Sequence, residues 1–153
     1  MAFDAAGHDH IRKSLHTHPI PSKLRNLTIS LQENNQTQIV TKTGKTKKIL
    51  CRRGVFQGAG LSPFIFNIAV DHIFTTLSES QVAEKFGFKV ADGLPKQSIC
   101  GFADDTNLMS SSLIGIKQLA IMAINLFEEC GFEINFQKST LIAIEKGVNS
   151  YSH

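Results

Sequence analysis

The chain has 153 residues, which is enough for one domain with a substantial core. Its formal charge of +3 is mild, so net charge alone does not indicate a nucleic-acid-binding protein. Its apolar runs are shorter than the roughly eighteen residues of a membrane-spanning helix, so no membrane span is expected. The three cysteines lack the spacing of a metal site, which favours reduced thiols in an intracellular protein.

The N-terminal part predicts two helices, which Pro19 and Pro21 separate. Ser22 is expected to cap the second helix, which should run to about Gln32. Its apolar residues recur at the three- and four-residue spacing of a helix face: Leu24, Leu27 and Leu31.

Four histidines near the N-terminus allow a zinc interpretation: His8, His10, His16 and His18. Residues two apart do not share a helix face, and no cysteine lies nearby. Exposed or locally hydrogen-bonded histidines are therefore the favoured interpretation.

Residues 37–53 predict a basic β-hairpin, because two β-prone runs, 37–41 and 48–51, flank Gly44. The segment has no acidic residue and holds six of the sixteen basic residues of the chain: Lys42, Lys45, Lys47, Lys48, Arg52 and Arg53. One interpretation is a solvated polar hairpin. The other is a contact with a nucleic-acid backbone.

A glycine-rich loop over 54–60 is expected to allow close approach of its backbone to a ligand. Ser62 and Pro63 then predict a helix, with the serine as cap and the proline in its first turn. This helix should reach about Leu77 and be mostly buried, since it is apolar nearly all round. A strand over 86–90 is expected next.

Two adjacent carboxylates, Asp104 and Asp105, interrupt an apolar stretch over 98–110 that is typical of a strand, a tight turn and a second strand. Two anions at a turn repel each other unless a cation lies between them, and a divalent metal prefers such oxygen ligands. A solvated Asp-Asp turn is the alternative.

The C-terminal part predicts an amphipathic helix from the serines at 110–112 to Cys130, followed by strands over 132–136 and 140–144. Residues 147–153 are expected to form a frayed tail. The element order favours an α+β fold, in which helices pack on one face of an antiparallel sheet.

Four segments in succession resemble signatures of reverse transcriptases, above all those of R2-like non-LTR retrotransposons. They are Arg53-Gly-Val-Phe-Gln-Gly58, Leu61-Ser-Pro-Phe-Ile-Phe-Asn67, Phe102-Ala-Asp-Asp105 and Gly131-Phe-Glu-Ile-Asn-Phe-Gln-Lys138. The opening Ala2-Phe-Asp-Ala-Ala-Gly-His8 resembles the end of a fifth. Together, in this order, they cover nearly the whole chain.

This resemblance implies a partial reverse transcriptase domain over 1–146, a right-hand polymerase palm without most of the fingers and the thumb. Asp104 and Asp105 would help to hold two Mg²⁺ ions, with Mn²⁺ as an alternative, for two-metal phosphoryl transfer. Lys138 matches a lysine that protonates the leaving pyrophosphate. Without the resemblance it would be a solvated turn lysine.

The remaining site residues also follow from the resemblance. Gln57 and Gly58 would lie against the template and the incoming nucleotide. Phe3 matches a bulky position that rejects a ribose 2′-hydroxyl and so selects dNTPs. Without the family, Phe3 would be a core aromatic, and Gln57 and Gly58 would belong to an ordinary loop.

The implied partners are an RNA template, a DNA primer and dNTPs, and a working element of this kind would act at nuclear DNA. The first metal-binding aspartate of the family is expected three residues before the position of Met1, which predicts that this chain is inactive by itself. A non-catalytic nucleic-acid-binding remnant that uses Lys45, Lys47, Lys48, Arg52 and Arg53 is the alternative, and a decayed product without a role is the third.

Overall fold

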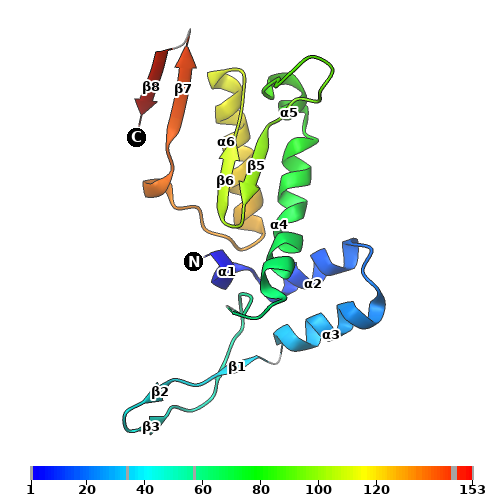
Figure 1. Cartoon of the computed structure of the whole chain (residues 1–153), viewed down its shortest axis with the longest axis vertical. Coiled ribbons are helices and arrows are strands. Elements are labelled where there is room, and N and C mark those ends of the chain that lie inside the picture. Colours follow the sequence, from blue (N-terminus) through cyan, green and yellow to red (C-terminus); the bar gives the residue numbers. More distant parts are fainter. Residues whose placement is uncertain (1, 34, 57, 146–147, 153) are drawn as a thin grey trace.

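The structure is a computed structural model that describes residues 2–33, 35–56, 58–145 and 148–152. Its fold is mixed α/β (Figure 1). The helices are α1 Ala2–Ala5, α2 His8–Thr17, α3 Ser22–Glu33, α4 Ser62–Ser78, α5 Gln81–Phe86, α6 Leu113–Glu129 and the 3₁₀ turn η1 Phe136–Lys138. The strands are β1 Gln36–Thr37, β2 Val40–Thr41, β3 Gly44–Lys45, β4 Ile49–Leu50, β5 Ile99–Phe102, β6 Asp105–Leu108, β7 Leu141–Glu145 and β8 Val148–Ser152.

Helix α4 is the centre of the core, as its apolar composition predicts. Its fully buried side chains include Phe66, Ile73 and Leu77. α2 packs on it from one side, and α6 packs on it from another. Leu119 of α6 is wholly buried against this cluster. Because each buried aliphatic or aromatic side chain contributes about 1.5–3 kcal/mol, these contacts dominate the stability of the domain.

Ser62 does not cap α4 as predicted. The helix is capped by Leu61, and the Ser62 side chain is buried within the first turn. Its hydroxyl donates a hydrogen bond to the carbonyl oxygen of Phe56. This serine therefore holds the preceding glycine-rich loop against the start of the helix.

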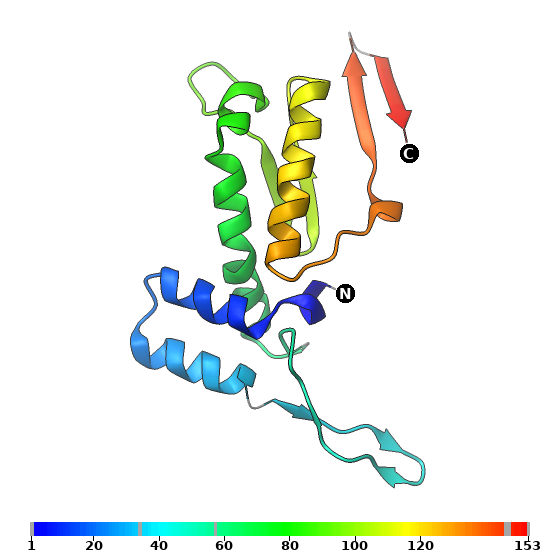
Figure 2. The ribbon, with the colours of Figure 1, turned by 180° about the vertical axis from the view of Figure 1, so that it is seen from behind.

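The predicted single antiparallel sheet is replaced by four separate two-stranded antiparallel pairs: β1 with β4, β2 with β3, β5 with β6, and β7 with β8. Helices α4 and α6 lie on one face of the β5–β6 pair, and Figures 1 and 2 show them from the two sides. The packing of helices on one face of strands is thus confirmed for this pair. The strands of the described residues do not form one continuous sheet.

Helix α6 begins as the sequence predicts. The Ser112 hydroxyl accepts a hydrogen bond from the backbone N–H of Gly115 at 3.1 Å, which satisfies one of the free donors of the first turn. At the other end Gly131 has φ +84, the left-handed conformation that commonly terminates a helix.

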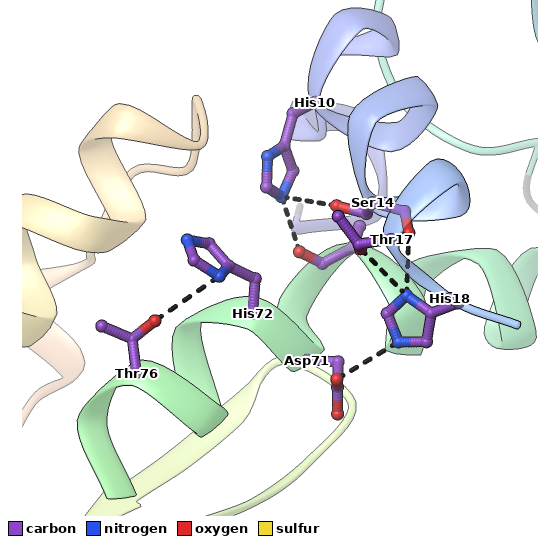
Figure 3. A network of polar contacts seen from close by, with 8 residues as sticks. His10, Ser14, Thr17, His18, Asp71, His72 and Thr76 are labelled. Atoms are coloured by element: carbon purple, nitrogen blue, oxygen red, sulfur yellow. Dashed lines mark hydrogen bonds and ion pairs between the residues drawn. The ribbon is translucent and has the colours of Figure 1, made fainter. Parts of the chain in front are cut away.

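Three of the four N-terminal histidines, His8, His10 and His18, make hydrogen bonds to other parts of the chain. His10 Nε2 donates to the carbonyl oxygen of Ala69 at 2.6 Å, and His18 lies 3.2 Å from Asp71, so both join α2 to α4 (Figure 3). His8 Nε2 donates to the carbonyl oxygen of Gly54 at 3.1 Å. The described residues contain no cluster of three side chains able to hold a metal. These hydrogen bonds join residues about 50 positions apart in the sequence, whereas local contacts were expected.

The predicted apolar face of α3 points to solvent. Leu24, Leu27 and Leu31 are 57%, 55% and 52% exposed. Gln32 is buried instead, with its side-chain oxygen unpaired. The helix itself forms where the sequence predicts it, but its orientation is the reverse of the one that its pattern favours.

Three other segments differ from the prediction. Residues 86–90 do not form a strand; α5 ends there, and Phe88 makes only an isolated bridge to Gln97. Residues 132–135 are irregular and lead into η1. The expected tail at 147–153 contains strand β8, which pairs with β7. No helix among the described residues is long and apolar enough to cross a membrane.

Gly54 is the glycine with the clearest steric requirement. Its φ is +83, and a Cβ atom would lie 2.7 Å from the Cα of Asp4 and 2.8 Å from the carbonyl oxygen of Phe3. The backbone pairs there as well, since Gly54 N–H donates to the carbonyl oxygen of Ala6 at 2.7 Å. Any side chain at Gly54 must push the chain start away from the loop.

Gly54→Ala is therefore expected to lower the free energy of unfolding by about 3 kcal/mol, because left-handed strain and a backbone clash add. Gly58→Ala is the matched control: its φ is +90, but a Cβ there would meet no atom within 4 Å, so a loss of about 1 kcal/mol is expected. Urea unfolding monitored by circular dichroism measures both. Equal losses in the two variants would contradict the packing of residues 3–6 against this loop.

Candidate functional site

The two adjacent carboxylates lie at the turn of the β5–β6 hairpin. Phe102 pairs with Asp105, so Ala103 and Asp104 form a two-residue turn. Ala103 has φ 54, the only positive φ of a non-glycine residue among those the structure describes. Such a conformation costs about 1–3 kcal/mol and is held by the strand pairing around it. The prediction of a strand, a tight turn and a strand is confirmed.

Gly101 brings the hairpin close to its supporting helix. A Cβ at Gly101 would lie 2.5 Å from the ring of Phe74 on α4 and 3.0 Å from the carbonyl oxygen of Asp105. Glycine therefore lets β5 lie flat on the helix layer, which positions the turn. The sequence contains this glycine, but without the fold nothing marks it as a packing requirement.

Both carboxylates are exposed and free of ion pairing with any cation that the structure describes. The turn lies at the end of the hairpin nearest α1, as both ribbon views show (Figures 1 and 2). Carboxylate oxygens of this kind suit Mg²⁺ or Mn²⁺, which keep part of their water shell. Asp104 and Asp105 thus fit a divalent metal, although the described residues bring no third such ligand to them.

Phe3 belongs to the aromatic cluster of the core. Its ring stacks on Phe66 with centroids 4.4 Å apart, and Phe66 in turn meets Phe132 edge to face at 5.9 Å. Phe3 is only partly buried, and its carbonyl oxygen accepts a hydrogen bond from the backbone N–H of Val55 at 2.8 Å. The start of the chain is thereby joined to the loop that precedes α4.

The glycine-rich loop presents Gly58 to solvent at the start of α4, with φ +90 and open space around it. Gln57 lies outside the described residues. The loop is held at its base by the Ser62 hydrogen bond to Phe56. Sequence reasoning missed this contact, because a serine before a proline is typical of a helix cap.

Lys138 ends η1 on the segment that joins α6 to β7, and it is exposed. Its backbone N–H lies 3.3 Å from Asn135 Oδ1, so the asparagine caps the turn. In both ribbon views this segment is set apart from the β5–β6 turn (Figures 1 and 2). The structure therefore brings Asp104 and Asp105 together, and Lys138 is not next to them.

The basic residues fall into two groups. Lys45, Lys47 and Lys48 lie on the β1–β4 hairpin and are exposed, and Arg52 follows them. Arg53 returns to the body of the domain, where its guanidinium donates to the carbonyl oxygen of Gly131 at 3.2 Å. This contact links the loop before α4 to the end of α6.

The sequence of this mixed α/β domain matches a known protein family. Residues 1–150 match the family model described as reverse transcriptase (RNA-dependent DNA polymerase), so the chain belongs to the reverse transcriptase family. Membership implies a polymerase palm.

The relatives narrow this family to retrotransposons of the R2 kind. The chain is 31% identical over 94% of its length to a retrovirus-related Pol polyprotein from type-1 retrotransposable element R2 of Popillia japonica, and 30% identical to one of Nasonia vitripennis. It is 25% identical to the Pol polyprotein from type-2 retrotransposable element R2DM of Drosophila melanogaster. The chain spans 20%, 13% and 13% of these three proteins. The predicted resemblance to R2-like reverse transcriptases is confirmed.

Proposed function

We propose that this chain is the palm part of an RNA-directed DNA polymerase that adds dNTPs to a primer 3′-hydroxyl on an RNA template. The observation that carries the proposal is the exposed pair Asp104 and Asp105 at a short hairpin turn, backed by α4 and α6, in a chain of the reverse transcriptase family. Such an activity would act at chromosomal DNA, which places it in the nucleus.

Asp104 and Asp105 are the residues proposed to hold the divalent metal. When bound, Mg²⁺ would supply Lewis-acid stabilisation of the charge that develops in phosphoryl transfer. The two side chains bring two negative charges to one turn without a basic partner among the described residues. That uncompensated charge favours a cation with an oxygen shell over a protein cation.

The other residues are proposed to position substrates. Phe3, fixed by its stack on Phe66, would present a rigid ring edge toward the sugar of the incoming nucleotide. Gly58, open and left-handed, would allow the template to approach the backbone, with Gln57 beside it. Lys138 would donate a proton to pyrophosphate, which requires its segment to move toward the turn.

Primer extension tests this proposal directly. The purified chain, and a longer version that includes upstream sequence, are supplied with a primed RNA template, dNTPs and Mg²⁺. We expect incorporation by the longer version only, since the described residues offer just two carboxylates at the turn. Chelating Mg²⁺ should stop it, and readdition should restore it.

One result would contradict the proposal, and another would contradict the expected inactivity of the chain by itself. Incorporation that persists in excess chelator would exclude the metal role of the two aspartates. Robust incorporation by the 153-residue chain alone would refute the need for a further ligand.

The second candidate function is nucleic-acid binding without catalysis. The observation that favours it is the exposed, acid-free basic hairpin between β1 and β4. Such binding would survive the loss of Asp104 and Asp105, whereas polymerisation would not. The two functions therefore separate in a variant that lacks both carboxylates.

A further inference from the structure

The hairpin from β1 to β4, residues 36–50, projects away from the rest of the domain, and we refer to it as the basic arm (Figures 1 and 2). All its paired residues are exposed, including Val40 at 72%. No ion pair within the described part of the chain involves its lysines. Four unpaired lysines on a thin projection repel one another, so the arm carries a stored electrostatic cost that an anionic partner would relieve.

An irregularity in the strand pairing decides which lysines share a face. Thr37 pairs with Ile49 at the base of the arm, and Val40 pairs with Lys45 nearer its tip. Two residues, 38–39, therefore lie opposite three, 46–48, which is the count of a β-bulge. Gln38 and Ile39 bridge the gap through Thr46, whose hydroxyl accepts from the Ile39 N–H at 3.0 Å.

The bulge brings Lys45 and Lys48 to the same face of the arm. In a regular strand two residues three positions apart project to opposite faces. Here Lys45 shares the face of its partner Val40, and Leu50 shares the face of its partner Gln36. Gln36 of β1 and Val40 of β2 are four positions apart, and Lys48 is two before Leu50, so regular alternation along the extended chain puts Lys48 on the side of Lys45.

We propose that this face, with Lys45 and Lys48, binds the phosphate backbone of a nucleic-acid strand. Two ammonium groups along one side of a hairpin can neutralise successive phosphates. The nature of the ligand rests on the proposed function, since a polymerase of this family needs a template. The binding surface itself is separate from the β5–β6 turn that carries Asp104 and Asp105.

The composition of the arm favours nucleic acid over a membrane surface. Segments that lie on membranes combine lysines with Trp, Phe or Leu that enter the lipid. Residues 36–50 contain no aromatic residue, and their apolar residues come as the adjacent pairs Ile39-Val40 and Ile49-Leu50, whose members project to opposite faces rather than gathering on one side. The arm therefore fits the anionic backbone of a nucleic acid, which its lysines can contact without any apolar side chain entering a lipid layer.

Fluorescence anisotropy with a labelled single-stranded RNA tests the proposal, with a single-stranded DNA of the same sequence as a parallel probe. Excess chelator removes divalent ions, so no metal bridge between Asp104 or Asp105 and a phosphate contributes to binding. The variant is Lys45→Gln with Lys48→Gln. Its charge-matched control is Lys13→Gln with Lys117→Gln, two exposed lysines on α2 and α6.

Losing two phosphate contacts should reduce the slope of log K against log salt by about 1.4. The unmodified chain should then lose about sevenfold more affinity than the arm variant between about 50 and 200 mM salt. The control pair should keep the full slope, and thermal unfolding should be unchanged because the arm lies outside the core.

Three outcomes would overturn the proposal: equal slopes in the arm variant and the unmodified chain, equal losses in the control pair, or binding to anionic vesicles but not to RNA or DNA. The outcome of this binding test is independent of the outcome of the primer-extension test. Salt-dependent RNA binding that needs Lys45 and Lys48 would stand even if primer extension failed, and primer extension could succeed with an arm that binds nothing.

Discussion

Asp104→Ala is expected to lower dNTP incorporation by about a thousandfold in any version of the chain that extends a primer. Loss of a metal ligand removes several kcal/mol of transition-state stabilisation, and about 4 kcal/mol corresponds to that factor. Because Asp104 is an exposed residue of the turn, the substitution removes charge without opening a cavity. Single-turnover primer extension over a range of Mg²⁺ concentrations measures the rate and the metal requirement together.

Asp92→Ala is the matched control for this experiment. Asp92 is also a turn aspartate, with a 98% exposed side chain, and it pairs with Lys89 in the segment between α5 and β5. Its loss should leave incorporation within about twofold of the unmodified chain, which is the size of a surface change. Full activity in Asp104→Ala would refute the metal assignment. A parallel loss in Asp92→Ala would show that the assay reports folding instead.

Phe66→Ala is expected to lower the free energy of unfolding by about 3–5 kcal/mol. Phe66 is 2% exposed, stacks on Phe3 and meets Phe132 edge to face. Its removal opens a cavity and takes away the partner that orders the start of the chain. Since a domain of this size has about 5–15 kcal/mol of stability, the variant should unfold at a much lower urea concentration.

Phe64→Ala, two residues earlier on the same helix, makes a direct comparison. Phe64 is 56% exposed, so its truncation should change the free energy of unfolding by less than about 1 kcal/mol. Urea unfolding of both variants with a common slope measures the difference. Similar losses would mean that α4 does not face the core as described, and the Phe3 contact would lose its support.

Local features of this chain could be predicted from sequence with good agreement. Ser112 caps α6, Gly131 terminates it, and the turn at Ala103 and Asp104 lies where small residues and carboxylates interrupt two β-prone runs. These features depend on groups within about four residues of one another, so a sequence window contains their causes. The sequence does not predict helix α5 over 81–86, because the β-prone run at 86–90 beside it favours a strand, although the Ser80 hydroxyl caps the helix by accepting from the Ala83 N–H at 3.1 Å.

The orientation of α3 shows why other features could not be predicted. Leu24, Leu27 and Leu31 form the stripe that usually faces a core, yet they face solvent. Which side of a helix is buried depends on the neighbours that cover it, and those neighbours are far away in sequence. The same reason explains why the strands form four separate pairs and why residues 132–135 stay irregular.

The sequence by itself determined the family, the long helices α3, α4 and α6, the acidic turn at Asp104 and Asp105, and the basic composition of the arm. Only the tertiary structure decided that Lys138 is set apart from that turn, that Arg53 bonds to Gly131, and that the strand pairing of the arm shifts by one residue between Thr37–Ile49 and Val40–Lys45. The physical reason is how far apart along the sequence the interacting groups lie. Caps, turns and helical periods arise from neighbouring residues, whereas strand register and the meeting of distant segments arise from the packing of the whole chain.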